Sequence, residues 1–422
     1  MVRVFPANFF LHREPLNEWL RKQGVAKFRE SFQMPFLALS LLPVKTGASM
    51  KTIQMVDLAS QTQRIRGEID AAISSVISNT AFINGPEVAN FAESLKSYLG
   101  AEYVIPCANG TDALQIALMA LELPEGSEVI SAGFSYAALA EVCALLKLRL
   151  VFVDADPDTF NINALEIEKH IGPNTRVIVP VHLFGQCSDM ETIMAIAEKH
   201  NLFVVEDNAQ SIGADYTFSD GRVQKSGTIG QIGTTSFFPS KNLGCFGDGG
   251  ALFTNSGKLA EKIKMIANHG QKKKYHHEII GVNSRLDTLQ AAILGVKIKY
   301  LDAYIAERRA VADQYDAAFS GLEGVLIPKR LNKSTHVFHQ YTLQLPGMDI
   351  ESVRTALAAA GIPSMVYYPL PLYRQEAYKQ NIHLPVTEML CSSVLSLPMG
   401  TDMDAAQIET ITFELTQIIK KQ

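Results

Sequence analysis

Residues 234–250 read Thr-Thr-Ser-Phe-Phe-Pro-Ser-Lys-Asn-Leu-Gly-Cys-Phe-Gly-Asp-Gly-Gly, with one lysine, Lys241, between β-prone residues and a glycine-rich turn. A lysine amine becomes a nucleophile when burial or a nearby cation lowers its pKa, and its usual product with a carbonyl compound is a Schiff base. Ser236 lies five residues upstream, where its hydroxyl can meet a phosphate beside that amine. The alternative is a lysine that extends from a strand end into solvent. The rest of the chain decides between these interpretations.

Short apolar runs alternate with helical stretches over the middle of the chain. Strands are predicted at residues 103–106, 128–131, 150–153, 176–181, 202–206 and 249–254, and helices from Thr111, from about Tyr136 and at residues 189–200. This alternation predicts an α/β fold, with a mostly parallel central sheet and helices on both of its faces. Ligands bind such sheets beyond the carboxyl ends of the strands, so the residues that follow each run are the first candidates for a site.

The length of 422 residues favours two domains. An amphipathic stretch at residues 284–319 is long enough to bridge them, and the segments 340–345, 349–360, 364–368 and a last helix from Asp404 predict a smaller α+β domain. We therefore expect an irregular N-terminal extension at residues 1–49, a large domain at residues 50–300 and a small C-terminal domain at residues 301–422. Met50 is then the natural start of the folded unit.

The composition, 47% hydrophobic and 19% charged, is that of a soluble globular protein. The net charge of −5 argues against a nucleic-acid-binding protein. No apolar run approaches the length of a membrane span; residues 35–44 are apolar but short, and a secretory signal there is the weaker alternative. The five scattered cysteines are typical of small buried residues in a reducing compartment, so we expect a cytoplasmic protein without disulfides or a metal site.

Candidate ligand-binding side chains follow three of the predicted strands. After the first strand, Gly110 and Thr111 present N–H groups at a helix start, which is an anion site, although Thr111 or Asp112 could equally be a plain helix cap. After the second, Tyr136 could stack on a planar ring or pack in the core. After the fifth, Asp207 could keep a ring nitrogen protonated or could cap the next turn.

The order of these residues along one sheet indicates a site for pyridoxal 5′-phosphate (PLP). In this interpretation the phosphate lies on Gly110, Thr111 and Ser236. Tyr136 stacks on the ring face, Asp207 bonds the ring nitrogen and Lys241 forms the Schiff base.

Four segments resemble the DegT/StrS family of nucleotide-sugar aminotransferases: Asn-Gly-Thr-Asp-Ala-Leu at 109–114, Glu-Asp-Asn-Ala-Gln at 206–210, Ser-Phe-Phe-Pro-Ser-Lys at 236–241 and Gly-Asp-Gly-Gly at 247–250. The resemblance runs from about Met55 to near the C-terminus. It implies a PLP fold-type I homodimer with active sites at the subunit interface. It also implies that Gln210 supports the cofactor ring and that Asn283, reaching across from the partner subunit, contacts the phosphate.

A narrower resemblance lies in residues 241–246, 269–277 and 281–292. These are similar to the branch that acts on UDP-2-acetamido-2-deoxy-3-oxo-glucuronate and makes a 3-amino sugar, with glutamate as amino donor, for bacterial surface polysaccharide such as O-antigen. A uronate carboxylate needs a guanidinium, and Arg285 is the candidate. The lysines at 272–274 could meet a diphosphate or could form a solvated loop.

The chain departs from the family pattern near its C-terminal end. Family members often read His-Tyr-Pro where this chain has Tyr367-Tyr368-Pro369, and they often carry histidine at the positions of Tyr373 and Gly400. His339 and Tyr341 align with a segment that borders the sugar site, and we expect both to contact the substrate.

The predicted reaction is a ping-pong transamination in which glutamate displaces Lys241 from PLP and the freed amine moves the proton as general base and acid. Three rivals remain. The substrate could be a 4-keto-6-deoxy sugar, although the region from Asn283 to Arg285 favours the uronate. Sugar dehydratases resemble this family with histidine in place of the lysine, so Lys241 argues against that activity. The intact Lys241, Asp207 and Ser236 argue against a non-catalytic regulator.

Overall fold

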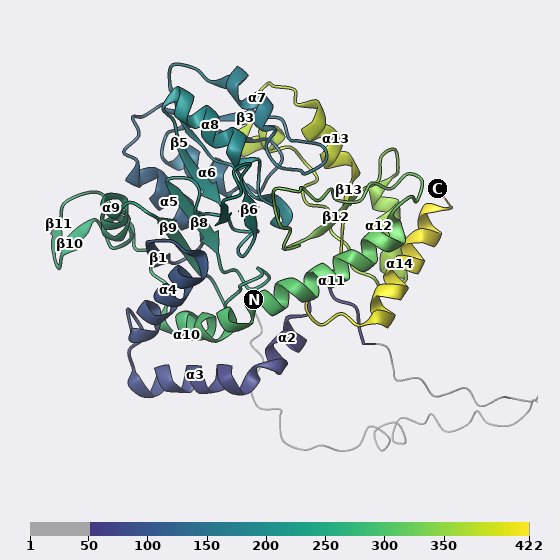
Figure 1. The fold of residues 1–422 in the computed structure, drawn as a ribbon, viewed down its shortest axis with the longest axis horizontal. Coiled ribbons are helices and arrows are strands. Elements are labelled where there is room, and N and C mark those ends of the chain that lie inside the picture. The colour runs from purple at the N-terminus through teal and green to yellow at the C-terminus, as the bar shows by residue number, and fades with distance from the viewer. Residues whose placement is uncertain (1–50, 422) are drawn as a thin grey trace, which may run out of the picture. The chain divides into compact units, whose positions relative to one another are not determined.

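The computed structural model describes residues 51–421; the predicted extension at residues 1–49, its apolar segment 35–44 and the start at Met50 lie outside these described residues. A seven-stranded sheet in the order β1-β9-β8-β5-β4-β2-β3 forms the centre (Figure 1). Its strands are β1 (Tyr103–Cys107), β2 (Glu128–Ala132), β3 (Arg149–Val153), β4 (Thr175–Ile178), β5 (Phe203–Asp207), β8 (Ile232–Ser236) and β9 (Gly250–Thr254). The strand β9 runs antiparallel to β1 and β8 on its two sides, and the other four pairs of neighbouring strands are parallel, so the predicted mostly parallel sheet is confirmed.

Helices cover both faces of this sheet, as predicted. Because side chains alternate along a strand, Val104 and Val204 belong to one core cluster and their neighbours Ile105 and Val205 to another. The first cluster packs on α4 (Pro86–Leu99), α8 (Met190–His200) and α10 (Thr288–Lys297). The second packs on α5 (Gly110–Ala120), α6 (Ala138–Leu145) and α9 (Gly257–Ala267).

The predicted bridging stretch 284–319 forms two helices. After α10, a 3-10 turn (Ile298–Tyr300) leads into α11 (Leu301–Phe319), which runs toward α12 and α14 in Figure 1. A third core cluster there joins α11 to α12 (Ile350–Ala359), α14 (Ala405–Ile419) and a small antiparallel sheet of β12 (Tyr341–Gln344) and β13 (Val394–Leu397). Ile53 also belongs to this cluster. The division at residue 300 stays a proposal.

Two details differ from the expected C-terminal part. The segment 364–368, expected to be a strand, makes only an isolated bridge between Met365 and Ser396, while the strand β13 was not predicted. The remaining elements are α2 (Leu58–Arg64), α3 (Arg66–Asn79), α7 (Ala164–Ile167), α13 (Pro385–Ser393), β6 (Asp215–Thr217), β7 (Val223–Lys225), β10 (Gln271–Lys273) and β11 (His276–His277). Within residues 51–421, none of the helices has the length and apolar character needed to cross a membrane.

Candidate active site

A cavity of about 470 Å³ opens where the carboxyl ends of β1, β2, β5 and β8 lead into loops. Seven of the predicted site residues line it: Gly110, Thr111, Tyr136, Gln210, Ser236, Lys241 and His339. Residues far apart in the sequence therefore meet at one edge of the sheet, as expected of ligand sites in such folds.

One end of the cavity is formed by the start of α5 and the end of β8. The Asn109 side chain caps α5 by accepting a hydrogen bond from the Asp112 N–H at 2.8 Å, so the alternative that Thr111 or Asp112 is the cap was wrong. The N–H groups of Gly110 and Thr111 have no acceptor among residues 51–421 and remain available to an anion. A Cβ on Gly110 would lie 2.7 Å from the Cβ of Ser236. This close approach places the Ser236 hydroxyl beside the helix start and requires glycine at position 110.

Replacing Gly110 with alanine should weaken cofactor binding by at least about tenfold, because the new methyl group pushes Ser236 and the helix start apart. Fluorescence titration of the apoprotein with PLP measures this effect. Gly67→Ala is the control, since a Cβ at this position of α3 meets nothing within 4 Å. Equal affinity of the Gly110→Ala variant and the wild type would contradict the phosphate cradle.

Lys241 and Asp207 are both half-buried, and the charges of their side chains interact. Burial lowers the pKa of Lys241 to about 8, and the negative charge of Asp207 opposes this shift. Burial raises the pKa of Asp207 above its ordinary value. Asp207 Oδ1 also accepts a hydrogen bond from the Ala209 N–H at 3.0 Å, so the turn-capping alternative is observed as well, with Oδ2 left for another donor. Near physiological pH the neutral fraction of this amine is thus far larger than that of an ordinary lysine, as a nucleophile or base requires.

The lowered pKa of Lys241 gives a pH prediction for the apoprotein. Only the neutral amine captures PLP, so the capture rate should rise with pH to a midpoint near 8 rather than near 10.5, the ordinary lysine value. In the Asp207→Asn variant the midpoint should move to lower pH, because the charge that favours the protonated amine is gone. Stopped-flow absorbance records the rate. A midpoint near the ordinary value in the wild type would show that Lys241 is not desolvated.

Aromatic side chains form one wall of the cavity. Tyr136 is 61% exposed, and its ring lies 6.3 Å from that of Tyr368, so the alternative of a core position for Tyr136 was wrong; Phe134 is the buried one. Gln210 links this wall to the loop after β4: its Oε1 accepts the Phe184 N–H at 2.7 Å, and its Nε2 donates to the Tyr368 hydroxyl at 3.3 Å. Tyr367 also lines the cavity.

The predicted substrate contacts separate into two groups. His339 lines the cavity and is buried; burial and the charges of Lys241 and Arg308 hold its pKa well below the ordinary value, and its Nδ1 has no hydrogen-bond partner within residues 51–421. Tyr341 does not line the cavity. It is fully buried in the core of the small sheet, where its hydroxyl donates to Asp316 at 2.8 Å, so its predicted contact with substrate is not supported.

Asn283 and Arg285 also lie outside the cavity that this single chain forms. Asn283 is exposed and Arg285 is half-buried. The lysines at 272–274 lie on and beside the β10–β11 hairpin. Lys272 forms an ion pair with Glu261, and Lys274 lies 5.2 Å from the centre of the Tyr275 ring. These contacts favour the interpretation of a solvated loop over that of a diphosphate site. The departures at Tyr373 and Gly400 lie away from the cavity, since Tyr373 packs in the core and bonds Glu388.

Sequence reasoning missed several residues that line the cavity. Phe184 comes from the loop after β4, Phe238 and Asp248 from the two ends of the Lys241 loop, and Gln340 from the segment before β12. The loop after the predicted strand 176–181 ends at the same sheet edge as the others, so Phe184 could have been found by searching it. Gln340 Oε1 has no hydrogen-bond partner among the described residues, which favours a ligand contact.

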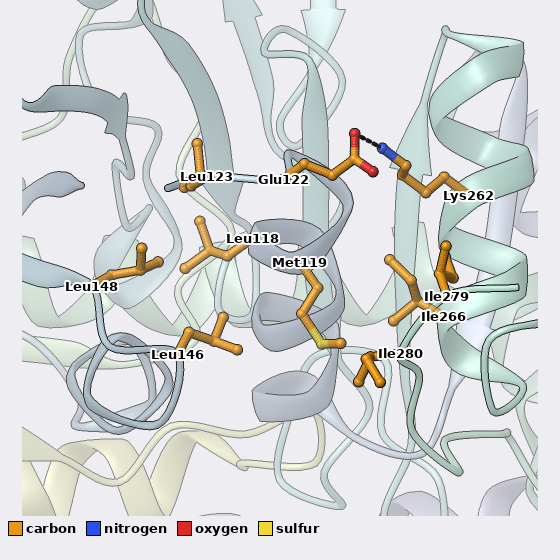
Figure 2. Close-up of a pocket in the computed structure, with 10 residues that line it drawn as sticks. All are labelled: Leu118, Met119, Glu122, Leu123, Leu146, Leu148, Lys262, Ile266, Ile279 and Ile280. Atoms are coloured by element: carbon orange, nitrogen blue, oxygen red, sulfur yellow. Dashed lines mark ion pairs between the residues drawn. The ribbon is translucent and has the colours of Figure 1, made fainter. Parts of the chain in front are cut away.

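Figure 2 shows a different cavity, of about 300 Å³, lined by apolar side chains of α5 and α9, by Ile279 and Ile280, and by the paired Glu122 and Lys262. None of the predicted site residues is among the described residues that line this second cavity. The predicted site residues therefore gather at the cavity around Lys241 and not at this one.

Comparison with known proteins gives related sequences over most of the chain. Residues 63–416 match the model of the DegT/DnrJ/EryC1/StrS aminotransferase family. The UDP-2-acetamido-2-deoxy-3-oxo-D-glucuronate aminotransferase of Pseudomonas aeruginosa is 46% identical, covering 86% of this chain and 99% of its own. A UDP-N-acetyl-3-dehydro-alpha-D-glucosamine 3-aminotransferase of Acidithiobacillus ferrooxidans is 42% identical, and the match covers 85% of this chain and 96% of the relative. A pleiotropic regulatory protein of Geobacillus stearothermophilus is 40% identical, and the match covers 87% of this chain and 99% of the relative.

A solved structure agrees with the fold. The crystal structure of NtdA from Bacillus subtilis with the bound cofactor PMP has a TM-score of 0.82 at 30% identity, covering 89% of this chain and 87% of NtdA.

Proposed function

This chain belongs to the DegT/DnrJ/EryC1/StrS aminotransferase family, and we propose that it transfers an amino group from L-glutamate to UDP-2-acetamido-2-deoxy-3-oxo-D-glucuronate. The chain is a PLP-dependent aminotransferase. The observation that carries the substrate proposal is the 46% identity with the Pseudomonas aeruginosa enzyme of that name along 99% of its length. The product would be the 3-amino sugar, for bacterial surface polysaccharide such as O-antigen.

The residues around the cavity fit PLP. The free N–H groups at the start of α5 and the Ser236 hydroxyl suit a phosphate, and the close approach of Gly110 and Ser236 leaves no room there for a side chain. Tyr136 and Gln210, which line the cavity, would hold the ring. Asp207, at the end of β5 and two residues before the lining residue Ala209, would bond the ring nitrogen. When bound, the cofactor supplies a protonated ring that takes up an electron pair.

Lys241 would move the proton in both half-reactions. With its pKa near 8, Nζ of Lys241 would accept the proton from the α-carbon of glutamate and pass it to the bound cofactor in the first half-reaction. In the second half-reaction it would carry a proton from the cofactor to carbon 3 of the sugar. Asp207, whose charge interacts with that of this amine, would supply the acceptor for the ring nitrogen. His339, which is held neutral, can exchange hydrogen bonds with substrate without a repulsive charge beside Lys241.

The active sites would be completed in a homodimer, with Asn283 of one subunit reaching the phosphate of the other and Arg285 binding the uronate carboxylate. The exposure of Asn283 supports this arrangement. Phe238 lines the cavity and is 52% exposed in the single chain, which also favours a covering subunit. All five cysteines are free and buried, which favours the cytoplasm.

A regulatory role is the second candidate, because the Geobacillus stearothermophilus relative carries that name. The lowered pKa of Lys241 favours catalysis, since a ligand sensor needs no neutral amine.

The substrate proposal is tested by steady-state kinetics with glutamate and three acceptors, with 2-oxoglutarate as the measured product. These are the UDP-3-oxo-uronate, the UDP-3-oxo sugar without the carboxylate, and a dTDP-4-keto-6-deoxy sugar. The first should give the highest kcat/KM, and the second is the matched control for the carboxylate. Higher kcat/KM with the 4-keto sugar would keep the family and overturn the substrate.

A further inference from the structure

A histidine and a glutamate form a fully buried pair one residue away from Asp207. His182 and Glu206 are both 0% exposed, and His182 Nε2 lies 2.9 Å from Glu206 Oε2. Glu206 also accepts the N–H groups of Gly227, Ile229 and Gly230 at 2.9, 2.6 and 2.6 Å. Since a buried carboxylate is costly unless every lone pair is bonded, these four donors are what allow Glu206 to stay in the core.

The neighbours of His182 determine which nitrogen carries its proton. The Ser188 N–H donates to Nδ1 at 3.1 Å, so Nδ1 must be the acceptor. Nε2 then carries the hydrogen and donates to Glu206. The ring is held from both ends and has one orientation.

The main chain around His182 holds two residues of the proposed cofactor site. The Asp207 N–H donates to the Pro180 carbonyl at 2.9 Å, and the His182 N–H donates to the Asp207 carbonyl at 3.0 Å. Two residues further on, the Phe184 N–H donates to the Gln210 side chain at 2.7 Å. The segment 180–184 is thus hydrogen-bonded both to the main chain of Asp207 and to the side chain of Gln210. A side chain of this segment also bonds β5 directly, through the hydrogen bond from His182 to Glu206.

We infer that His182 is a positioning residue of the aminotransferase: its bond to Glu206 sets the segment 180–184 against β5, and so sets Asp207 and Gln210 against the cofactor ring. Side chains alternate along a strand, so Glu206 points away from the ring while Asp207 points toward it. The pair therefore acts through the strand and touches no reactant. This inference rests on the proposed PLP site.

Two variants separate the two bonds of His182. His182→Gln places an N–H near the position of Nε2 and keeps the bond to Glu206, but it loses the acceptor for Ser188. His182→Asn keeps that acceptor and is too short to reach Glu206. Each apoprotein is titrated with PLP and with an analogue in which carbon replaces the ring nitrogen. The analogue cannot use Asp207, so the comparison isolates the carboxylate.

We expect His182→Asn to bind PLP about tenfold more weakly than the wild type, with a smaller loss for the analogue, which still depends on Gln210, while His182→Gln binds both as the wild type does. Equal losses for PLP and analogue, wild-type PLP binding by His182→Asn, or failure of His182→Asn to fold while His182→Gln folds would each overturn the inference. A wild type that binds no PLP would instead overturn the proposed function.

Discussion

Lys241→Ala is expected to lower turnover by at least about 10⁴-fold, because the variant loses the amine that we propose bonds the cofactor and moves the proton. The phosphate cradle at Gly110, Thr111 and Ser236 does not involve this side chain, so the purified variant should still bind PLP. Steady-state assays give the rate, and absorbance spectra of the dialysed protein give the bound cofactor. Lys264→Ala, which removes an exposed lysine of α9, is the control and should be fully active.

Small primary amines sharpen this test. If the lost group is the base, added ethylamine should restore part of the activity of Lys241→Ala and should not change the control. Sustained turnover by Lys241→Ala without added amine would remove Lys241 from the reaction.

Asp207→Asn is expected to lower turnover by about 10³-fold, since in the proposed site the ring nitrogen loses the carboxylate that would keep it protonated. Asparagine keeps the shape of the side chain and an oxygen for the Ala209 N–H, so the turn after β5 should survive. The rate is measured with saturating PLP to separate catalysis from binding, and Asp220→Asn at an exposed site is the control. Activity within tenfold of the wild type would mean that the Asp207 carboxylate serves only the turn.

The sheet could be predicted because six of its seven strands are short, mostly apolar runs, and most of these alternate with helices. The strand β8, which ends at the predicted site residue Ser236, was not predicted. Its sequence, Ile-Gly-Thr-Thr-Ser, has little apolar character, and its position in the sheet is set by pairing with β5 and β9. The stretch 364–368 is β-prone in sequence, but after one bridge at Met365 the chain places Tyr367 and Tyr368 at the cavity instead. Local propensity cannot report which partner a strand will find.

The site, too, could be predicted only where local sequence determines the position of a residue. Residues directly after strands could be predicted, because the carboxyl ends of parallel strands share one edge. His339 and Tyr341 are two residues apart, yet β12 begins at Tyr341, so the alternation of a strand does not extend to His339 and only the histidine reaches the cavity. Asn283 and Arg285 lie outside the cavity of the single chain, and the contacts that we propose for them need a partner subunit, whose position no sequence pattern gives. The tie from His182 to Glu206 is a long-range contact of the same kind.

The most direct measurement follows the two half-reactions separately. Enzyme loaded with PLP is converted to the pyridoxamine phosphate form with glutamate, freed of glutamate, and then mixed with UDP-2-acetamido-2-deoxy-3-oxo-D-glucuronate. The visible absorbance of the lysine-bound cofactor should disappear with glutamate and return, one equivalent per site, with the keto sugar. An enzyme that forms neither state, or whose absorbance returns with no keto sugar, would contradict the assignment of Lys241 and its cavity as an aminotransferase site.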